Sequence, residues 1–422
     1  MSGVRRRRFL VAAIIGNALD WFDFTVFGYL AAPISAQFFP VDARWAGVIS
    51  TFGVFALSFL IRPLGGIVIG HYTDILGRKT MMVVVIGTMS VGTGMICLTP
   101  GYAVIGMAAP LLLVVARALQ GLAAGGEFAS ATTFLIEYAP DGSRGLYGSW
   151  QIAGQGAAIF LSGAIVTLLS SVLTPEAVQS WGWRVPFFVG LIAGPIGFYI
   201  RASASESLEF LETRATSAAS AVSPIRAILR HQKRRVVIGC GLVIGGTAAL
   251  YVLFIFMPTY ALHVLKRPPA TSFLGPGIGG LSLAACCPLA GALSDRIGAK
   301  SVMTVAALCL LLVLYPAFLW LKDEPSLMRL AATEFAFGAI GSLYGGPFCA
   351  AIADLFPVKL RATALAAVYN VCVALFGGSA PLIVAWTIAA TGNPLAPAYY
   401  VMVCILSSLA AVIALPPARR SL

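Results

Sequence analysis

Charged residues are scarce in this sequence. Asp, Glu, Lys and Arg make up 10% of the 422 residues, whereas hydrophobic residues make up 59%. A soluble chain carries about 25% charged residues, so a set of soluble domains is excluded. The long apolar stretches instead indicate a membrane protein with many spanning segments.

Several chemical signatures are also missing. The three His residues are scattered, and the eight Cys residues include no C-x-x-C pair, so neither a metal site nor a disulfide framework is indicated. No spacing of a nucleophile and a base points to catalysis. We therefore expect no metal, no cofactor and no enzyme activity.

The apolar residues fall into helix-length segments. Twelve of them can be counted, and they start near residues 9, 45, 80, 104, 145, 184, 236, 271, 301, 327, 362 and 396. A polar stretch separates the first six from the last six. This predicts an N-terminal half over residues 1–200, a cytoplasmic linker over 201–235 and a C-terminal half over 236–422.

The net charge of +12 has two explanations, a nucleic-acid partner or membrane topology. With both termini in the cytoplasm, the cytoplasmic segments hold 20 of the 28 Lys and Arg residues, which follows the positive-inside rule. We therefore expect a multi-pass protein of the cell inner membrane, with both termini cytoplasmic and no nucleic-acid partner.

Polar side chains gather on one face of the fourth segment. At about 100° per residue, Arg117, Gln120 and Glu127 share one sector of a helix. A charged side chain at bilayer depth costs roughly 2.5–3.5 kcal/mol and normally faces a water-filled cavity or a partner. The first segment places Asp20 and Asp23 about halfway across, on one side of its helix.

A motif in the first half returns in the second. E-x-x-P-x-x-x-R at 137–144 reappears 217 residues later as D-x-x-P-x-x-x-R at 354–361. The same offset places Glu334 at the position of Arg117. The repeat predicts two related six-helix halves, and Glu127 and Glu334 are expected to act as charge partners within the membrane.

A second motif also occurs twice. G-x-x-x-D-x-x-G-R-K at 70–79 returns 221 residues later as G-x-x-x-D-R-x-G-A-K at 291–300. Acids and bases on adjacent helix ends can form an ion-pair latch that breaks and re-forms as the halves move. The expected members of this cytoplasmic gate are Gly70, Asp74, Gly77, Arg78, Glu137, Arg144, Asp295, Arg296, Asp354 and Arg361.

These motifs are similar to the signature of the major facilitator superfamily. The whole chain resembles its metabolite/proton symporters, whose members carry citrate and tricarballylate, oxoglutarate, shikimate, dicarboxylates, or proline and betaine. The likeness rests on motifs in order: G-N-x-x-D-x-x-D-F at 16–24, R-P at 62–63, R-x-x-Q-G…G-E at 117–127, G-S-W-Q at 148–151, G-W-R-x-P-F at 182–187 and R-A-T…Y-N…F-G-G…P at 361–381. The resemblance implies an all-α membrane protein of twelve transmembrane helices in two pseudo-symmetric six-helix halves.

The function expected from this resemblance is proton-coupled import of a small organic acid, a di- or tricarboxylate such as citrate, by alternating access. Arg62 and Arg117 would supply fixed positive charge for a carboxylate, and Asp20 or Asp23 would carry the proton. Further candidates for binding the substrate are Gln120, Gln151, Gln155, Tyr251, Tyr369 and Asn370.

Other interpretations stay open. A proton-coupled proline or betaine carrier would be favoured by aromatic residues around the site, through cation–π contacts, and an organic-anion exchanger is a further alternative. Arg117 could instead pair permanently with Glu127 or Glu334 and only stabilise the bundle. The expected partners are a small solute, protons and the lipid bilayer. We expect the protein to function as a monomer, because one chain supplies both halves.

Overall fold

The computed structural model describes residues 3–40, 45–76, 78–192, 230 and 232–416. The side chains of 3–13, 70, 74, 78, 79, 82 and 359 lie outside this description. The helices, in chain order, are α1 (Gly3–Tyr29), α2 (Ala31–Phe38), α3 (Ala46–Leu76), α4 (Arg78–Leu98), α5 (Tyr102–Ile105), α6 (Ala108–Ala124), α7 (Glu127–Glu137), α8 (Arg144–Val172), α9 (Pro175–Ser180), η1 (Gly182–Arg184), α13 (Lys233–Leu250), η2 (Tyr251–Phe256), α14 (Met257–His263), α15 (Pro269–Ile297), α16 (Ala299–Asp323), α17 (Leu327–Asp354), α18 (Val358–Cys372), η3 (Val373–Gly378), α19 (Ala380–Thr391) and α20 (Ala396–Ile413).

The prediction of a twelve-helix membrane protein is confirmed. In the described part of the chain, nine helices or runs of joined helices are long and apolar enough to cross a membrane. Two shorter apolar helices, Val83–Leu98 and Gly182–Ile192, and the 27-residue α1 account for the other three segments. Every predicted start falls in or just before one of these helices.

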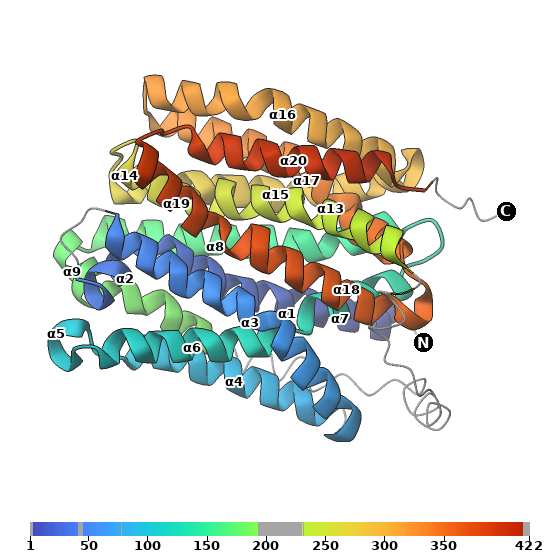
Figure 1. The fold of residues 1–422 in the computed structure, drawn as a ribbon, viewed down its shortest axis with the longest axis horizontal. Helices are drawn as coiled ribbons and strands as arrows, with labels where there is room; N and C mark the ends of the chain where they lie inside the picture. The colour runs from blue at the N-terminus through green and yellow to red at the C-terminus, as the bar shows by residue number, and fades with distance from the viewer. Residues whose placement is uncertain (1–2, 41–44, 77, 193–229, 231, 417–422) are drawn as a thin grey trace.

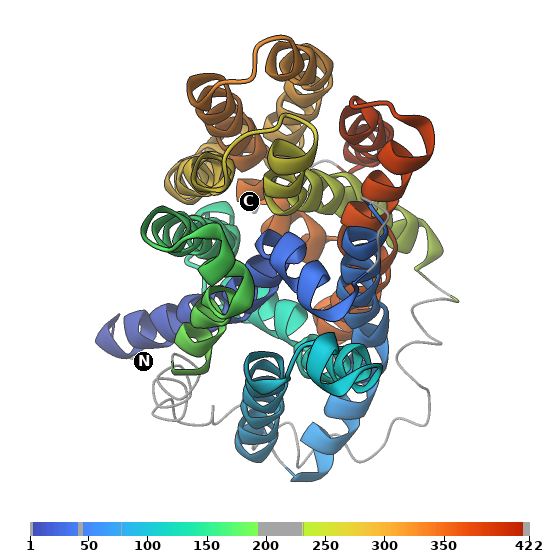
Figure 2. The ribbon, with the colours of Figure 1, turned by 90° about the vertical axis from the view of Figure 1, so that its left-hand side faces the viewer.

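The long helices run side by side in two groups (Figure 1). α13, α15, α16, α17 and α20 lie on one side and α1, α3, α4 and α6 on the other. α8 lies between the groups and packs against both α1 and α15. The view along the helices shows the same division, with α1 running from the edge at the N-terminus toward the centre, where α2 lies (Figure 2).

The two ends of the bundle differ. α7 and α18 meet at one end, where α20 also finishes, and the short helices α2, α5, α9 and α14 lie at the other (Figure 1). We call these the α7/α18 end and the α5/α9 end. The predicted linker over 201–235 lies almost wholly outside the described residues, so the boundaries of the two halves stay a prediction.

Glycine pairs allow the two halves to approach closely where α8 crosses α15. A Cβ atom on Gly156 would lie 2.8 Å from the carbonyl oxygen of Gly280, and one on Gly163 would lie 2.8 Å from the Cα of Gly277. Small residues at such crossings bring backbones together and favour packing between membrane helices. This contact is therefore the close-packed seam about which the remaining helices of the halves are arranged.

Candidate functional site

Arg117 and Asp23 belong to one buried chain of hydrogen bonds. The Arg117 Nη1 donates to Oε1 of Gln120 at 2.7 Å, and the Gln120 Nε2 donates to the Thr93 hydroxyl at 2.9 Å. That hydroxyl donates to Oδ2 of Asp23 at 2.5 Å. All four side chains are buried. A cation on α6 is thus connected through α4 to a protonatable group on α1.

Aromatic rings surround the two arginines. The Arg117 guanidinium carbon lies 4.2 Å from the ring centre of Phe27 and 4.7 Å from that of Phe24. The guanidinium carbon of Arg62 lies 4.4 Å from Phe24 and 4.0 Å from Phe59. Cations over ring faces gain about 2 kcal/mol when desolvated. The shared ring of Phe24 therefore keeps two positive groups close together away from water.

Arg62 and Arg117 each keep an N–H donor that is not used in a hydrogen bond to a described residue. Within the described part of the chain, the Nε atoms of Arg62 and Arg117 are buried and lack a hydrogen-bond partner. The Arg117 charge interacts with Asp23, Arg62 and the Tyr251 hydroxyl. A guanidinium presents five N–H donors in a fork that matches a carboxylate. Donor capacity is consequently available here for an anionic group.

The predicted helix through Glu127 forms one membrane-crossing run, Ala108–Glu137, with a short turn inside it. The chain leaves regular helical geometry at Gly125 and Gly126, between α6 and α7. Gly125 packs against the α3 backbone at Arg62, and its carbonyl oxygen accepts a 2.5 Å hydrogen bond from Asn370 Nδ2. Two consecutive glycines permit this break, because a side chain at Gly125 would overlap α3. Glu127 is the first residue after this turn and begins α7.

A pocket lies between the two halves. It contains about 670 Å³ of space not filled by protein atoms, open solvent included. Among the described residues that line it, none carries a charge. Seven aromatic side chains line it: Trp21, Tyr251, Phe254, Phe337, Tyr344, Phe348 and Tyr369.

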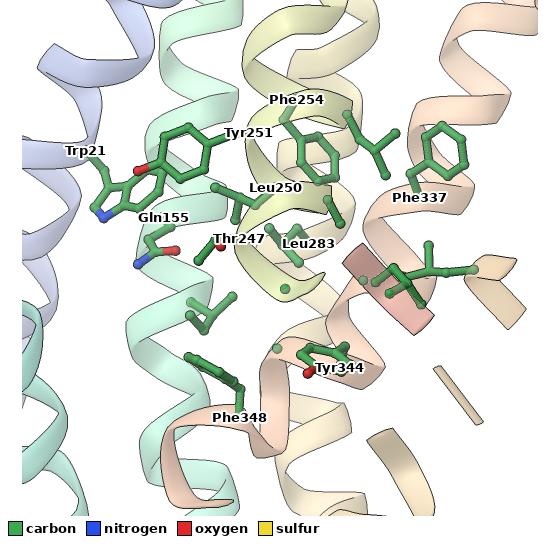
Figure 3. A pocket seen from close by; sticks show the side chains of 18 of the residues that line it. Trp21, Gln155, Thr247, Leu250, Tyr251, Phe254, Leu283, Phe337, Tyr344 and Phe348 are labelled. Carbon is green, nitrogen blue, oxygen red and sulfur yellow. The ribbon is translucent and has the colours of Figure 1, made fainter. Parts of the chain in front are cut away.

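The polar groups of the pocket are distributed unequally (Figure 3). The Tyr344 hydroxyl donates to the carbonyl of Leu242 at 2.8 Å and is thereby occupied. In the described structure, the Tyr251 hydroxyl and the Gln155 Nε2 have no hydrogen-bond partner. Both lie on the Trp21 side of the pocket, opposite Phe337 (Figure 3). The pocket therefore has one end with free donors and one apolar end.

Tyr251 connects the pocket to the arginines. Its ring packs on Trp21 at 5.6 Å and on Phe59 at 5.2 Å between ring centres. The Tyr251 hydroxyl also interacts with the charges of Arg62 and Arg117. Tyr251 is the first residue of η2, a π-helical turn, and such turns occur frequently at functional sites. The end of the pocket that carries free donors is thus the end that faces the positive charge.

Two other predicted substrate residues are held by protein groups. The Gln151 Oε1 accepts a 2.7 Å hydrogen bond from Thr132, and its Nε2 donates to the Phe128 carbonyl at 3.3 Å. Gln120 is the central member of the chain between Arg117 and Thr93. In this conformation both amides position neighbouring helices rather than face the pocket.

Tyr369 and Asn370 join the halves. The Tyr369 ring stacks on Phe128, with ring centres 3.4 Å apart and planes 2° from parallel. Asn370 Nδ2 donates to the Gly125 carbonyl oxygen at 2.5 Å. Tyr369 lines the pocket, whereas Asn370 fastens α18 to the break between α6 and α7.

The remaining predicted charges are placed differently. Glu334 is fully buried in α17, and both carboxyl oxygens lack a hydrogen-bond partner within the described residues. The expected contact between Glu334 and Arg117 is not among the electrostatic interactions of Arg117. Asp20 and Glu127 are half-buried, and each makes an interaction of its own. The structure thus brings Arg117 to Asp23.

The repeated motif forms reciprocal ion pairs at the α7/α18 end. Arg144 of the first copy contacts Asp354 of the second at 2.8 Å. Arg361 of the second copy contacts Glu137 of the first at 3.6 Å, and its Nε donates to the Ala353 carbonyl at 3.0 Å. Each copy therefore pairs with the opposite copy across the two halves.

The loop motif contributes a helix cap. Asp295 accepts hydrogen bonds from the backbone N–H groups of Gly145 and Leu146, at 2.7 and 2.9 Å. A carboxylate at a helix N-terminus is stabilised by these unpaired N–H groups and by the helix dipole. Asp295 thus joins α15 to α8, while Arg296 is exposed.

The first copy of the loop motif lies partly outside the described residues. Gly70 and Asp74 lie in α3, and Arg78 begins α4. Gly77 lies outside the described residues, as do the side chains of Asp74 and Arg78. Their role in the gate stays a prediction.

Sequence reasoning missed several residues of the site. Thr93 completes the chain to Asp23, Ser58 accepts from Arg117 Nη2 at 3.4 Å, and Phe24 contacts both arginines. Thr93 and Ser58 lie in apolar helices without a motif, so no sequence signal marks them. Phe24 lies in the first-helix motif, and that motif is the signal that could have identified it.

The fold and the site define a helical membrane transporter, with a central pocket between two halves and charge pairs that connect them. The model of the Major Facilitator Superfamily matches residues 13–381. The chain belongs to this superfamily.

Two curated relatives match nearly the whole chain. A citrate-proton symporter of Salmonella typhi is 35% identical over 396 residues, which are 94% of this chain and 91% of that protein. The glycine betaine/proline/ectoine/pipecolic acid transporter OusA of Dickeya dadantii strain 3937 is 34% identical over 418 residues, 96% of this chain and 82% of its own length. Transport of a small solute is the activity that these two relatives share.

Solved structures share the fold. A proton:xylose symporter, XylE, bound to 6-bromo-6-deoxy-D-glucose has a TM-score of 0.78 at 17% identity, covering 99% of this chain and 97% of its own. The partially occluded inward-open conformation of XylE from E. coli has a TM-score of 0.74 at 17% identity, covering 97% and 98%. At this identity the likeness shows the architecture alone.

Proposed function

We propose that this protein imports a small carboxylate solute together with protons, and that a di- or tricarboxylate such as citrate is the first candidate. The observation that carries the proposal is the buried chain from Arg117 through Gln120 and Thr93 to Asp23. It connects a group that can bind an anion to a group that can bind a proton. The citrate-proton symporter among the relatives supports the same substrate class.

The coupling follows from competition for charge. When Asp23 is ionised, it attracts Arg117 through the connected hydrogen bonds and through space. When Asp23 takes up a proton, that attraction is lost, and the positive field of Arg117 and Arg62 becomes available to a substrate carboxylate. Proton binding and anion binding then reinforce each other, which is the thermodynamic requirement for symport.

The pocket suggests how a solute would be oriented. Its carboxylate would meet the free donors of Tyr251 and Gln155, next to the arginines. The remainder of the solute would face Phe254 and Phe337 at the other end. The proton carrier would be Asp23 rather than Asp20, because Asp23 is the acid in the chain to Arg117.

A second candidate is favoured by one observation. Seven aromatic side chains and no charged residue line the described pocket, and such an environment suits a quaternary ammonium through cation–π contacts. A betaine carries both that group and a carboxylate. The relationship to OusA, which is described as a glycine betaine transporter, agrees with this candidate.

Further properties belong to the same proposal. The protein carries its solute unchanged, without enzyme chemistry, and functions as one chain in the cell inner membrane. Both termini lie in the cytoplasm, because this orientation satisfies the positive-inside rule. The α7/α18 end is then cytoplasmic, and the α5/α9 end faces outward.

The experiment is uptake of radiolabelled citrate, oxoglutarate, succinate and glycine betaine into proteoliposomes. Wild type is compared with Trp21→Ala, Arg62→Gln and the control variants Trp181→Ala and Arg329→Gln, because Trp181 is exposed and Arg329 pairs with Glu324 away from the pocket. If the substrate is an organic acid, uptake of citrate, oxoglutarate or succinate should be saturable, and Arg62→Gln should abolish it. A betaine substrate predicts that Trp21→Ala raises its KM by about 30-fold, which corresponds to a cation–π loss of roughly 2 kcal/mol. Absence of uptake of all four solutes would contradict both candidates.

A further inference from the structure

Glu334 occupies an unusual place in the second half. Its side chain is fully buried, and neither carboxyl oxygen has a hydrogen-bond partner within the described residues. An ionised carboxylate without partners costs several kcal/mol in a protein interior. No hydrogen bond to a described residue accounts for an acid at this position.

The surroundings of Glu334 come from several elements. Gly279 of α15 is the contact point, because a Cβ atom there would lie 2.9 Å from the Glu334 Oε2 and 2.6 Å from the Phe254 ring. Phe254 and Phe337, one turn further along α17, both line the pocket. The carboxyl of Glu334 therefore lies directly behind the apolar end of the pocket.

Tyr29 is the group from the first half that acts on Glu334. It is the last residue of α1, its ring stacks on Phe273 of α15 at 6.1 Å, and its hydroxyl interacts with the Glu334 charge. The hydroxyl is buried and lacks a hydrogen-bond partner in the described structure.

The position along α17 separates Glu334 from the gate. Asp354, which pairs with Arg144 at the α7/α18 end, lies 20 residues further along the same helix, or roughly 30 Å at 1.5 Å per residue. Glu334 is thus near the α5/α9 end. If Tyr29 moved away from α15 and α17, the carboxyl of Glu334 would be exposed to water at the α5/α9 end.

We propose that Glu334 is a second proton-binding site of the transport cycle, distinct from Asp23. A proton from water adds to one carboxylate oxygen when the α5/α9 end is open. The neutral acid is then enclosed by Tyr29, Phe254 and Gly279 as the halves close, which gives the conformation seen here. Because the buried form must be neutral, closure at this end requires the proton. This inference rests on the proposed proton coupling.

The first test measures the proton-to-substrate ratio from reversal potentials in proteoliposomes. Glu334→Gln imitates the neutral acid and cannot exchange a proton. We expect it to retain counterflow, which moves no net proton, and to have a ratio lower by one proton than wild type. Glu324→Gln is the matched control, because it removes an exposed carboxyl near the start of α17 and should leave the ratio unchanged. Equal ratios in Glu334→Gln and wild type would overturn the proposal.

The second test needs no substrate. The infrared spectrum of the purified protein should contain a protonated carboxylic acid band that Glu334→Gln lacks and Glu324→Gln retains. If Glu334→Gln does not assemble, Glu334→Asp should keep the wild-type ratio and displace the band, and an unchanged spectrum would overturn the proposal. Absence of solute transport by wild type would contradict the proposed function, while the infrared result would still decide on Glu334.

Discussion

Asp23 and Arg117 lie on different helices and are joined by the side chains of Thr93 and Gln120, at hydrogen-bond lengths of 2.5, 2.9 and 2.7 Å. Every donor in this chain points toward Asp23. The Asp23 carboxylate therefore accepts its hydrogen bond from the Thr93 hydroxyl. That hydroxyl accepts a hydrogen bond from the Gln120 amide, and the guanidinium of Arg117 orients the amide. A change in the charge of Asp23 is felt at Arg117, which is the property that a coupled transporter requires.

The hydroxyl of Thr93 should tune the protonation of Asp23. Thr93→Val keeps the shape of the side chain and removes the hydrogen bond to the carboxylate, which is worth roughly 1.5–3 kcal/mol for a charged acceptor. Without it, the protonated form of Asp23 is favoured. The pH at which proton-driven uptake is half-maximal should therefore rise by roughly one to two units. Thr88→Val, a change at a half-buried position on the same helix whose hydroxyl donates to the Val84 carbonyl, should leave the pH profile unchanged, and an unshifted profile for Thr93→Val would contradict this role.

The reciprocal ion pairs should set the population in which the α7/α18 end is closed. The side chains of Arg144 and Asp354 are 48% and 49% exposed, so the pair contributes only about 0.2–1 kcal/mol. Arg144→Asp should lower the closed population by up to about fivefold, as that energy implies. Arg144→Asp combined with Asp354→Arg should restore it.

Spin labels at Asp141 and Val358, two exposed positions on either side of this contact, can measure the opening as a distance distribution. The single variant should lengthen the distances, and the double variant should return them toward wild type. A double variant that stays open would show that the pair does not hold the halves together.

The contact between α3 and α6 should not tolerate a larger residue at Gly65. A Cβ atom there would overlap the backbone of Leu122, which cannot rotate away as a side chain can. Gly65→Ala should destabilise the protein by about 1–3 kcal/mol, the usual cost of overpacking. Gly53→Ala is the control on the same helix, because no atom lies within 4 Å of its added Cβ, and it should gain about 0.5–1 kcal/mol from better helix propensity. Thermal unfolding in detergent distinguishes the two, and equal stabilities would contradict the packing.

The sequence predicted the helices well and their contacts poorly. Runs of apolar residues mark membrane segments directly, since the bilayer fixes their length. The repeated motif also predicted the residues of the ion pairs, although not that each copy binds the opposite copy. That Arg144 meets Asp354 depends on how two halves dock, which no local pattern contains.

The residues of the polar site could also be predicted only in part from the sequence. Arg117, Gln120 and Asp23 were identified because polar residues are rare in apolar helices. Thr93 was not, because threonine is common in membrane helices and binds their own carbonyls. The turn at Gly125 and Gly126 had a signal in its two glycines, and the single membrane-crossing run predicted through it is present as Ala108–Glu137. Which acid reaches Arg117 was decided by the packing of α1 against α4 and α6.

The most direct test compares Asp23→Asn with Asp20→Asn in proteoliposomes, with the transported solute measured both under an inward proton gradient and in counterflow. Asparagine keeps the size of the acid and cannot carry a proton. The structure predicts that Asp23→Asn loses all accumulation above equilibrium while counterflow continues, and that Asp20→Asn still accumulates the solute. Gradient-driven accumulation that survives in Asp23→Asn would contradict the assignment of Asp23 as the coupling acid.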